Sequence, residues 1–532
     1  MKKFVAPDLA LEEMTVAALL QRRAQETPTR MFLRFGEESA TFAQVHDRSV
    51  MYANAIARSG VQQHDYVALM MVNSLEYVYT YFGLARRGVA VVLVNTAYRG
   101  YMLEHVLIDA GVSTMIVDAD LVPVLIESLA SLPGLRRILI VGATGDLSTW
   151  EADAPAVDFM PFVADAAQVT GGAVVTVDHA DAHCVVYSSG TTGPSKGIVI
   201  TNAHAVVKAI EVLRICHFTA DDVLYSPLPL FYSMGLLRGV LSAMLVGSTI
   251  VLRDRFSVTA FWDDVRATGA TVAHCVFSLP EMLKTAPAHP RDGDNSLRCM
   301  FNARHDPEFE ERFGLRCIES YGLTEAGNAI YSRIDEPPRL GSCGRVSEEW
   351  DVLLADPQGR EVPVGDMGEI LIRPRLPHRM MIGYLNQPEA TVAATRNLWL
   401  HTGDLASVDA GGYYTYRGRL KEVIRRRGQN ISAWEVEKIL SEHPAVRESA
   451  AYAFPSPIGE DDLRVSIVAH DGVVADLEDI AAHCARRMPP FMVPRYYEFR
   501  EDFPRTPSGR IQKHILRDEE LPDWCFDRER VT

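Results

Sequence analysis

A polar loop between two apolar runs brings together residue types that suit phosphate chemistry. Residues 187–197 read YSSGTTGPSKG and combine hydroxyl side chains, glycines and one lysine between the apolar runs 184–186 and 198–200. Such runs are typical of buried strands, so the stretch between them is predicted to be a tight loop. Glycines expose backbone N–H groups, hydroxyls donate hydrogen bonds and a lysine adds positive charge, which suits the oxygens of a phosphate chain. A flexible surface turn is the alternative interpretation.

This loop is not a Walker loop. That motif needs a glycine directly before its lysine and a serine or threonine directly after it. Here Ser195 precedes Lys196 and Gly197 follows it. The chemistry predicted for the loop is therefore phosphate binding by a different motif.

Two further stretches place carboxylates where an α/β sheet binds ligands. Residues 319–325 read ESYGLTE and follow an expected strand at 315–318, so Glu325 is placed to hold Mg²⁺ together with substrate phosphates. Residues 399–404 read WLHTGD, and Asp404 beside a glycine turn is placed to accept both hydroxyls of a ribose. An ordinary turn is the alternative interpretation for each stretch.

A basic segment follows these motifs. Residues 416–430 read YRGRLKEVIRRRGQN, and they come before an expected helix over 432–442 for which Ser432 and Glu435 form a capping box. We interpret this segment as a hinge between two compact regions. The alternative interpretation of Arg425–Arg427 is a solvated basic turn.

The elements that must position these residues alternate between strands and helices. Expected strands at 31–35, 66–71, 90–94, 113–117 and 138–141 alternate with expected helices, one capped by Thr41 and one capped by Asn73. This alternation predicts an α/β fold with parallel sheets covered by helices. A buried strand is expected at 271–277, with His274 as a core histidine, and the last ~100 residues predict a small α+β domain.

Composition excludes several classes of protein. The chain has 532 residues, a length that favours two to four domains. Its net charge of −16 argues against nucleic acid or an anionic membrane as a partner, because both attract basic surfaces. No apolar run is long enough to span a bilayer, and the N-terminus lacks the core of a signal peptide. The eight cysteines are scattered without CxxC pairs, which fits a reducing cytosol. We therefore expect a cytoplasmic protein.

Taken in order, these motifs resemble those of the adenylate-forming superfamily of acyl-CoA synthetases, peptide-synthetase adenylation domains and luciferases. The resemblance extends from YFGLA at 81–85 to Lys513, and within the superfamily it is greatest to bacterial ligases of the crotonobetaine/carnitine–CoA ligase type. Five spaced motifs carry it: the loop at 187–197, YGLTE at 321–325, GYLNQPEAT at 383–391, TGD at 402–404 and GRLK at 418–421.

The resemblance implies a fold and a reaction. It implies a large N-terminal domain of parallel or mixed sheets layered with helices over residues 1–419, and a small mobile α+β domain over 420–532 that rotates about a hinge at Lys421. The implied reaction uses MgATP to convert a carboxylic acid into an acyl-adenylate, with release of pyrophosphate. Coenzyme A then displaces AMP to give a thioester. Catalysis of this kind depends on positioning and on neutralising charge at phosphate oxygens.

The resemblance also implies roles for individual residues. Thr324 is implied to contact the α-phosphate, Glu325 to hold Mg²⁺, and Asp404 and Arg419 to bind the ribose. The rest of the implied nucleotide site is Tyr321 and Gly322 with the loop residues Ser188, Ser189, Gly190, Thr191, Thr192, Gly193 and Lys196. The implied acyl pocket contains Tyr232, Met234, Gly235, Phe277, Asn302 and Ala303, and the implied contacts to coenzyme A are Arg426, Arg427 and Gly428.

The chain departs from the family pattern in three places. The adenylation lysine normally follows Ser/Thr-Gly, but here Arg510 occupies that position. Either Arg510 or the nearby Lys513 is expected to act in catalysis, and slow adenylation is the third alternative. Tyr232 stands where many relatives have histidine, and a phenol cannot become cationic. FNARHDP at 301–307 replaces a small, glycine-rich run, with Arg304 and His305 expected to face solvent or to recognise a polar acyl group.

We therefore expect an AMP-forming acid–thiol ligase that uses ATP, Mg²⁺ and coenzyme A and acts on a small carboxylic acid. A stand-alone adenylation enzyme that loads a carrier protein is the first alternative. A non-catalytic nucleotide-binding relative, conceivable because of Arg510, is the second. The sequence leaves open the acyl group and the oligomeric state, a homo-oligomer included.

Overall fold

The computed structural model describes residues 8–142, 147, 150, 156–162, 175–188, 194–276, 278–420, 424–431, 433–456, 459–470, 472–473, 475–504 and 511–530. By its internal contacts the chain divides into two compact units. The first contains residues 1–96, 107–187 and 197–418, and the second contains residues 97–106, 188–196 and 419–532. The division at 419/420 into two functional domains stays a prediction.

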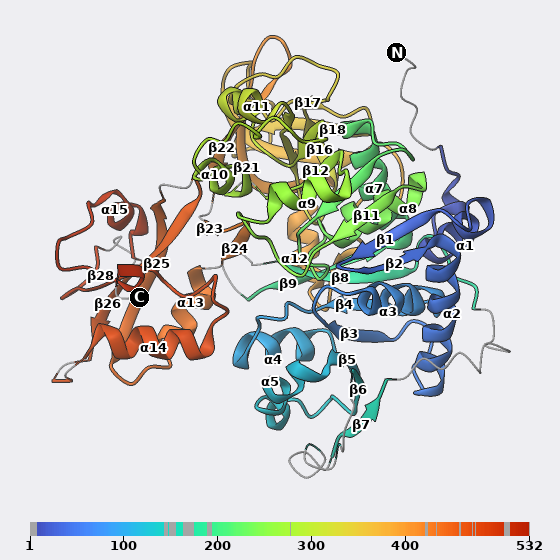
Figure 1. Cartoon of the computed structure of the whole chain (residues 1–532). Helices are drawn as coiled ribbons and strands as arrows, with labels where there is room; N and C mark the ends of the chain where they lie inside the picture. Colours follow the sequence, from blue (N-terminus) through green and yellow to red (C-terminus); the bar gives the residue numbers. More distant parts are fainter. Residues whose placement is uncertain are drawn as a thin grey trace. The chain divides into compact units, whose positions relative to one another are not determined.

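An eight-stranded, mainly parallel sheet forms one half of the first unit (Figure 1). Apart from the two edge strands, its strands are rich in valine, isoleucine and leucine and are buried at their centres, as parallel strands covered on both faces require. The strands in spatial order are β20 (Gly383–Tyr384), β9 (Lys196–Thr201), β8 (Ala182–Ser188), β4 (Ala90–Leu93), β3 (Tyr66–Met70), β5 (Thr114–Asp118), β6 (Arg137–Val141) and β7 (Asp158–Pro161).

A seven-stranded sheet forms the other half of the first unit. All its neighbouring pairs are parallel except β1 with β2, which are antiparallel. The carboxyl ends of the parallel strands therefore meet at one edge, where ligands bind in such sheets. The strands in order are β14 (Arg316–Ile318), β13 (Cys299–Phe301), β12 (Val272–His274), β10 (Val223–Ser226), β11 (Thr249–Leu252), β1 (Met31–Phe35) and β2 (Glu38–Thr41).

Two smaller antiparallel sheets complete the first unit. One has the order β15 (Ser320–Gly322), β16 (Asn328–Tyr331), β17 (Arg345–Val346). The other has the order β18 (Trp350–Ala355), β19 (Met367–Pro374), β21 (Leu400–Val408), β22 (Tyr414–Arg419). The carboxylates predicted to bind the nucleotide and its metal lie in these two sheets and in their turns.

The second unit is a small α+β structure. A four-stranded sheet of β25 (Val446–Pro455), β26 (Asp461–Ala469), β27 (Tyr496–Phe499) and β28 (Phe526–Asp527) accompanies the hairpin of β23 (Ile424–Arg426) and β24 (Gln429–Ile431). Its core includes Val436, Val465 and Tyr497. Its helices are α13 (Ala433–Leu440), α14 (Leu477–Arg487) and α15 (Lys513–Asp518).

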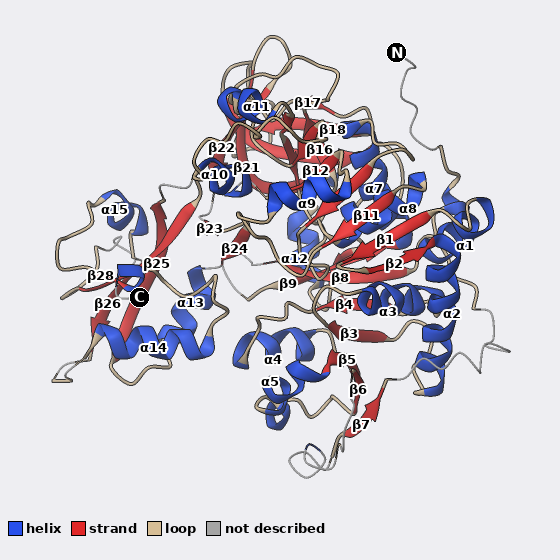
Figure 2. Ribbon diagram, in the orientation of Figure 1, coloured by secondary structure: helices blue, strands red, loops and turns tan. Residues whose placement is uncertain are grey.

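Helices cover the sheets of the first unit (Figure 2). Packing against the rest of the protein stabilises these helices more than the intrinsic helix propensity of their residues does. In α7, for example, every residue but one is buried. The helices are α1 (Val16–Glu26), α2 (Phe42–Arg58), α3 (Leu75–Arg86), α5 (Val122–Ile126), α7 (Asn202–Cys216), the π-helical turn η5 (Leu236–Val240), α8 (Leu241–Val246), α9 (Phe261–Thr268), α10 (Ser278–Lys284), α11 (Pro307–Phe313) and α12 (Pro388–Ala394), and α4 (Gly100–Asp109) is shared by both units.

These elements confirm the predicted α/β class and most predicted elements. Thr41 caps α2 with a complete capping box, as predicted. The predicted cap Asn73 was wrong, because Ser74 caps α3 by accepting the N–H of Tyr77. The strand expected at 271–277 is shorter and ends at His274, which is fully buried as a core histidine is expected to be. None of the described helices has the length and apolarity needed to cross a membrane.

Candidate active site

Asp404 and Tyr321 form a buried pair in the first unit. The Tyr321 hydroxyl donates to Asp404 Oδ2 at 2.8 Å, and only 2% of Asp404 is exposed. The Tyr416 hydroxyl lies 3.5 Å from Asp404 Oδ1, and the Tyr321 and Tyr416 rings stack at a centroid distance of 6.2 Å. The carboxylate predicted to bind ribose therefore lies beside two aromatic rings, which suits a nucleoside.

A bulge in β21 positions Asp404. The pairing of β19 with β21 shifts register between Glu369 and Leu371, opposite the turn Thr402–Asp404. Gly403 has φ 70°, a conformation that favours glycine, and its N–H donates to Glu369 Oε1 at 3.0 Å. The Thr402 hydroxyl donates to the Ile370 carbonyl at 2.7 Å. The TGD motif is thus a fixed bulge rather than an ordinary turn.

Glu325 lies on the turn between β15 and β16, and a second motif supports it. The Tyr384 hydroxyl donates to Glu325 Oε1 at 3.0 Å, and the Met381 N–H donates to the Glu325 carbonyl at 2.8 Å. Thr324 and Glu325 are half-buried, whereas the next three residues are buried, so these two side chains lie at the accessible part of the turn. One carboxylate of this kind fits Mg²⁺, which is usually held by one or two carboxylates together with substrate phosphates.

The GYLNQPEAT motif holds Tyr384 in place. Tyr384 lies in β20, and its N–H donates to the Thr391 hydroxyl at 2.9 Å. A Cβ at Gly383 would come within 2.9 Å of Thr391 Cγ2, so the strand and α12 pack too closely there for a larger residue. The motif therefore supports the residue that contacts Glu325.

The predicted acyl-pocket residues include two at the carboxyl ends of neighbouring strands. Asn302 follows β13 with φ 62°, and its Nδ2 donates to the Cys275 carbonyl, directly after β12, at 3.3 Å. The N–H of Ala303, which is buried, donates to the carbonyl of Ile318, the last residue of β14, at 3.1 Å. Asn302 and Ala303 therefore tie three parallel strands together at the edge where α/β sheets bind ligands.

Asn73 fixes the segment that precedes Tyr232. Its Nδ2 donates to the carbonyls of Leu228 and Arg253 at 3.0 and 2.7 Å, and its Oδ1 accepts the N–H of Leu230 at 2.8 Å. Beyond that segment Tyr232 is half-buried and Met234 is buried. A Cβ at Gly235 would lie 2.4 Å from the Pro229 carbonyl oxygen, so this tight bend requires glycine.

The two polar residues after Ala303 differ from each other. Arg304 is exposed, as predicted. His305 is not, because only 13% of its side chain is exposed and its Nδ1 lies 2.7 Å from Glu310 Oε1. Glu310 also accepts the N–H of Cys317, so His305 is held against α11 and β14. The prediction that His305 faces solvent was wrong.

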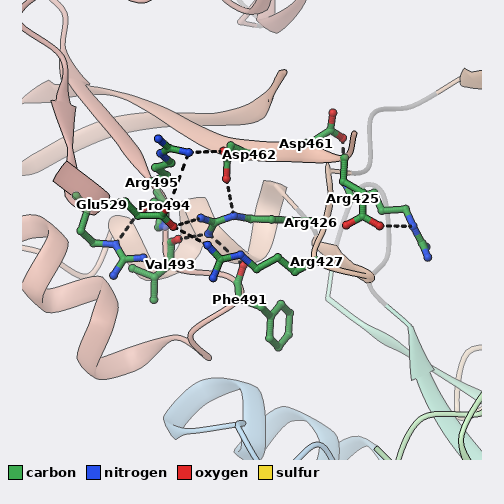
Figure 3. A network of polar contacts seen from close by, with 12 residues as sticks. Arg425, Arg426, Arg427, Asp461, Asp462, Phe491, Val493, Pro494, Arg495 and Glu529 are labelled. Atoms are coloured by element: carbon green, nitrogen blue, oxygen red, sulfur yellow. Dashed lines mark hydrogen bonds and ion pairs between the residues drawn. The ribbon is translucent and has the colours of Figure 1, made fainter. Parts of the chain in front are cut away.

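In the second unit, Arg426 is part of a buried ion-pair network (Figure 3). Only 1% of its side chain is exposed, and it donates to Asp462, to the Val493 carbonyl and to Glu529 at 3.0, 2.7 and 3.0 Å. Burial lowers the pKa of Arg426. A solvated basic turn therefore does not describe Arg426, and its guanidinium is already engaged by protein oxygens.

The turn after Arg426 has the geometry of a tight hairpin. Arg427 and Gly428 have φ 51° and 76° and join β23 to β24 as a two-residue connection. Half of the Arg427 side chain is exposed, and it donates to Glu529 at 2.7 Å. The Gly428 N–H donates to Glu460 Oε2 at 2.8 Å. Of the three residues predicted to contact coenzyme A, only Arg427 presents an exposed cation.

Lys513 is engaged by a carboxylate of the same unit. Its Nζ lies 2.5 Å from Glu437 Oε1, and the same oxygen accepts the N–H of Ala451 at 2.6 Å. Burial raises the pKa of Glu437. The ammonium group of Lys513 is thus paired with a carboxylate. Lys513 would have to leave Glu437 before it could bind a phosphate, which argues against a direct catalytic role.

Ser195, near the end of the loop at 187–197, also has a carboxylate partner within the second unit. Glu435 Oε1 accepts the N–H of Ser195 at 2.8 Å, and His105 Nε2 donates to the Ser195 carbonyl at 2.8 Å. Burial raises the pKa of Glu435 to about 7. Ser188 ends β8 and Lys196 begins β9, which confirms that the loop joins two strands.

Several predicted site residues lie outside the described residues. They are Ser189–Gly193 of the loop, Phe277 of the acyl pocket, Lys421 of the hinge and Arg510, and the capping residue Ser432 is also among them. For Arg419 the backbone alone is described, as the last residue of β22. The roles of these residues stay predictions.

Sequence reasoning missed two residues that contact the predicted site carboxylates. Tyr384 contacts Glu325 and Tyr416 contacts Asp404. Tyr384 lies inside a motif that signals its importance. Tyr416 has no comparable signal, because its relation to Asp404 depends on the pairing of β21 with β22.

Comparisons with known proteins agree with these motifs. The family model for AMP-binding enzymes matches residues 20–385, and the model for the AMP-binding enzyme C-terminal domain matches residues 435–510. Crotonobetaine/carnitine–CoA ligases of Salmonella heidelberg and Salmonella typhimurium are 31% identical over 487 residues, which covers 90% of this chain and 93% of theirs.

Solved structures share the fold. A double mutant of the o-succinylbenzoate CoA synthetase of Bacillus subtilis superposes with a TM-score of 0.77 at 24% identity, covering 94% of this chain and 98% of that one. The amide bond synthetase McbA of Marinactinospora thermotolerans gives a TM-score of 0.82 at 22% identity, with coverage of 94% and 99%. On the evidence of the two family models and the curated relatives, the chain belongs to the family of AMP-binding enzymes.

Proposed function

We propose that this protein is an ATP-dependent carboxylate–CoA ligase that forms AMP. The observation that carries the proposal is the Asp404–Tyr321 pair on its fixed bulge, with Glu325 on the turn that follows Tyr321. These groups suit a nucleoside and a metal–phosphate group, and they occur in a chain whose curated relatives are CoA ligases.

The proposed reaction has two steps, adenylation of the acid and transfer of the acyl group to coenzyme A. A carboxylate oxygen of the acid attacks the α-phosphorus of ATP, and the bond to the oxygen that bridges to the β-phosphate breaks to release pyrophosphate. The thiol of coenzyme A then attacks the acyl carbon and loses its proton, and the bond to AMP breaks. The adenylate is needed because a free carboxylate has no usable leaving group.

The residues of the first unit serve the first step through positioning and charge. Asp404 accepts the ribose hydroxyls, and the Tyr321 hydroxyl orients its carboxylate at 2.8 Å. Thr324 donates to the α-phosphate. Glu325 would hold Mg²⁺, which neutralises negative charge on the phosphates when bound.

The acid is proposed to bind between the segment at Tyr232–Gly235 and the strand ends at Asn302 and Ala303. These residues combine apolar groups with a few polar tips, which suits a small or medium acid, including one that resembles carnitine. Tyr232 supplies an aromatic wall and no cation. Arg427 is proposed to contact coenzyme A through its exposed guanidinium. Arg426 is not, because its guanidinium is buried among its protein partners.

A panel assay tests the proposal. Purified protein with MgATP is given short, medium, aryl and carnitine-like acids, with and without coenzyme A, and pyrophosphate, AMP and thioester are measured. We expect AMP and thioester to form in equal amounts only when an acid and coenzyme A are both present. Adenylate formation with no transfer to coenzyme A would favour a carrier protein as acceptor, and no ATP consumption with any acid would favour a non-catalytic relative.

A further inference from the structure

One face of α7 carries three buried titratable side chains. His204, Lys208 and Glu211 are spaced by four and three residues, so they share one face of the helix. Each is at most 1% exposed. Burying an ammonium group costs several kcal/mol unless it is well bonded, so a fully buried lysine requires specific partners.

The partners of Lys208 are carbonyl groups of the turn between β15 and β16. Lys208 Nζ donates to the Leu323 carbonyl at 3.3 Å and makes a short hydrogen bond to the Ala326 carbonyl. His204 Nε2 lies 2.9 Å from the same Ala326 oxygen, so it carries a proton and donates. The lysine therefore spans the turn and binds it on both sides of Thr324 and Glu325.

Glu211 holds the other end of the same turn. Its Oε2 accepts the N–H of Asn328 at 2.7 Å, and its Oε1 accepts the indole N–H of Trp350 at 3.3 Å. The backbone of Gly327 packs directly on this carboxylate, because a Cβ there would come within 1.9 Å of Oε1. The turn is thus fixed by a buried lysine and a buried glutamate of one helix.

In this arrangement the backbone carbonyl oxygens of the turn between β15 and β16 accept hydrogen bonds from donors of the protein. The carbonyls of Leu323 and Ala326 bind Lys208, and the carbonyl of Glu325 accepts the Met381 N–H at 2.8 Å. The Gly327 carbonyl accepts the N–H of Leu323 at 3.3 Å, within the turn itself. Unpaired carbonyl oxygens would repel phosphate oxygens, so a turn that receives a triphosphate gains from having them bound.

We propose that Lys208 is a positioning residue for ATP. It acts through the turn that carries Thr324 and Glu325, and it touches neither the acid nor the reacting atoms. The proposal rests on the proposed function, in that Thr324 and Glu325 are assigned to ATP and its metal. It implies that loss of Lys208 weakens ATP binding and leaves the affinity for the acid unchanged.

The test compares Lys208→Met and Lys208→Gln with Arg214→Met. Arg214 is the matched control because it is a cation of the same helix that pairs with Glu349 instead of the turn. For each variant the KM values for ATP and for the acid, the Kd of ATP from calorimetry and the Tm are measured. The glutamine variant keeps a donor without the charge, so it separates hydrogen bonding from charge.

Lys208→Met is expected to raise the KM and Kd of ATP at least about tenfold, or about 1.4 kcal/mol, with the KM of the acid within about twofold of wild type. Lys208→Gln is expected to be intermediate. Arg214→Met is expected to lower the Tm with unchanged ATP constants. If Lys208→Met does not fold, the glutamine variant decides the question.

A folded Lys208 variant with wild-type ATP constants would overturn the positioning role. A proportional rise in the KM of both substrates would overturn it as well, because that is the signature of a general structural defect. If the wild-type protein consumes no ATP with any acid, the proposed ligase function fails. The calorimetric comparison of ATP binding still tests Lys208 in that case.

Discussion

At the scale of single residues, the chain brings together carboxylates and the hydroxyls that orient them. Asp404 and Glu325 each accept a hydrogen bond from a tyrosine, at 2.8 Å from Tyr321 and 3.0 Å from Tyr384. A carboxylate held in this way has a defined orientation. This is what binding by positioning requires.

The departure at Arg510 leads to a prediction at this scale. Because Lys513 pairs with the half-buried Glu437, Lys513→Met is expected to lower the free energy of unfolding by about 1–2 kcal/mol while the folded variant still releases pyrophosphate. Arg510→Met is expected to slow pyrophosphate release at least about tenfold, because it removes a cation from the developing phosphate charge. Urea unfolding and a pyrophosphate assay measure the two effects. The opposite pattern, with activity lost in the lysine variant alone, would assign catalysis to Lys513.

At the scale of elements, the hairpin β23–β24 depends on the C-terminal residues of the chain. Arg426 of β23 binds Asp462 of β26 and Glu529 of the turn η7 (Arg528–Arg530) that ends the described chain. Arg495 binds Asp462, as Arg426 does (Figure 3), and it also binds Asp527, so the two arginines share one acidic cluster. This cluster helps to hold the hairpin in place, together with the hairpin's own residues Ile424 and Ile431, which are buried in the core of the second unit.

Two neighbouring arginines test this dependence. Arg426→Met is expected to lower the free energy of unfolding by about 3 kcal/mol, because it leaves buried carboxylate oxygens without their partner. Arg427→Met removes a half-exposed cation from the same Glu529 and is expected to cost less than about 1 kcal/mol. Urea unfolding of both variants provides the comparison. Equal losses would show that burial of Arg426 contributes nothing beyond a surface ion pair.

The elements also show what could be predicted from the sequence. Continuous apolar runs such as 66–70 and 90–93 predict strands because parallel strands are buried on both faces. Asn73 is predicted to cap a helix because asparagine often does so, but its side chain instead bonds to the backbone of Leu228, Leu230 and Arg253. The burial of Arg426 and the partners of Lys208 depend on contacts between distant segments, which local patterns do not encode.

At the scale of the whole molecule, the AMP-binding motifs and the acidic charge agree on an enzyme that acts on small molecules. The net charge of −16 disfavours nucleic acid as a partner. The motifs that predicted the family are spread over the chain, and TGD, YGLTE and GYLNQPEAT each have a physical role in the first unit.

We propose that this one protein carries out both steps through an acyl-adenylate intermediate. The most direct measurement incubates the enzyme with MgATP and an accepted acid without coenzyme A, separates the protein from free nucleotide, and identifies bound species by mass spectrometry. Coenzyme A is then added to the isolated complex. We predict an acyl-adenylate on the protein that is converted to equimolar acyl-CoA and AMP. Formation of ADP and phosphate, or an adenylate that coenzyme A leaves unchanged, would contradict it.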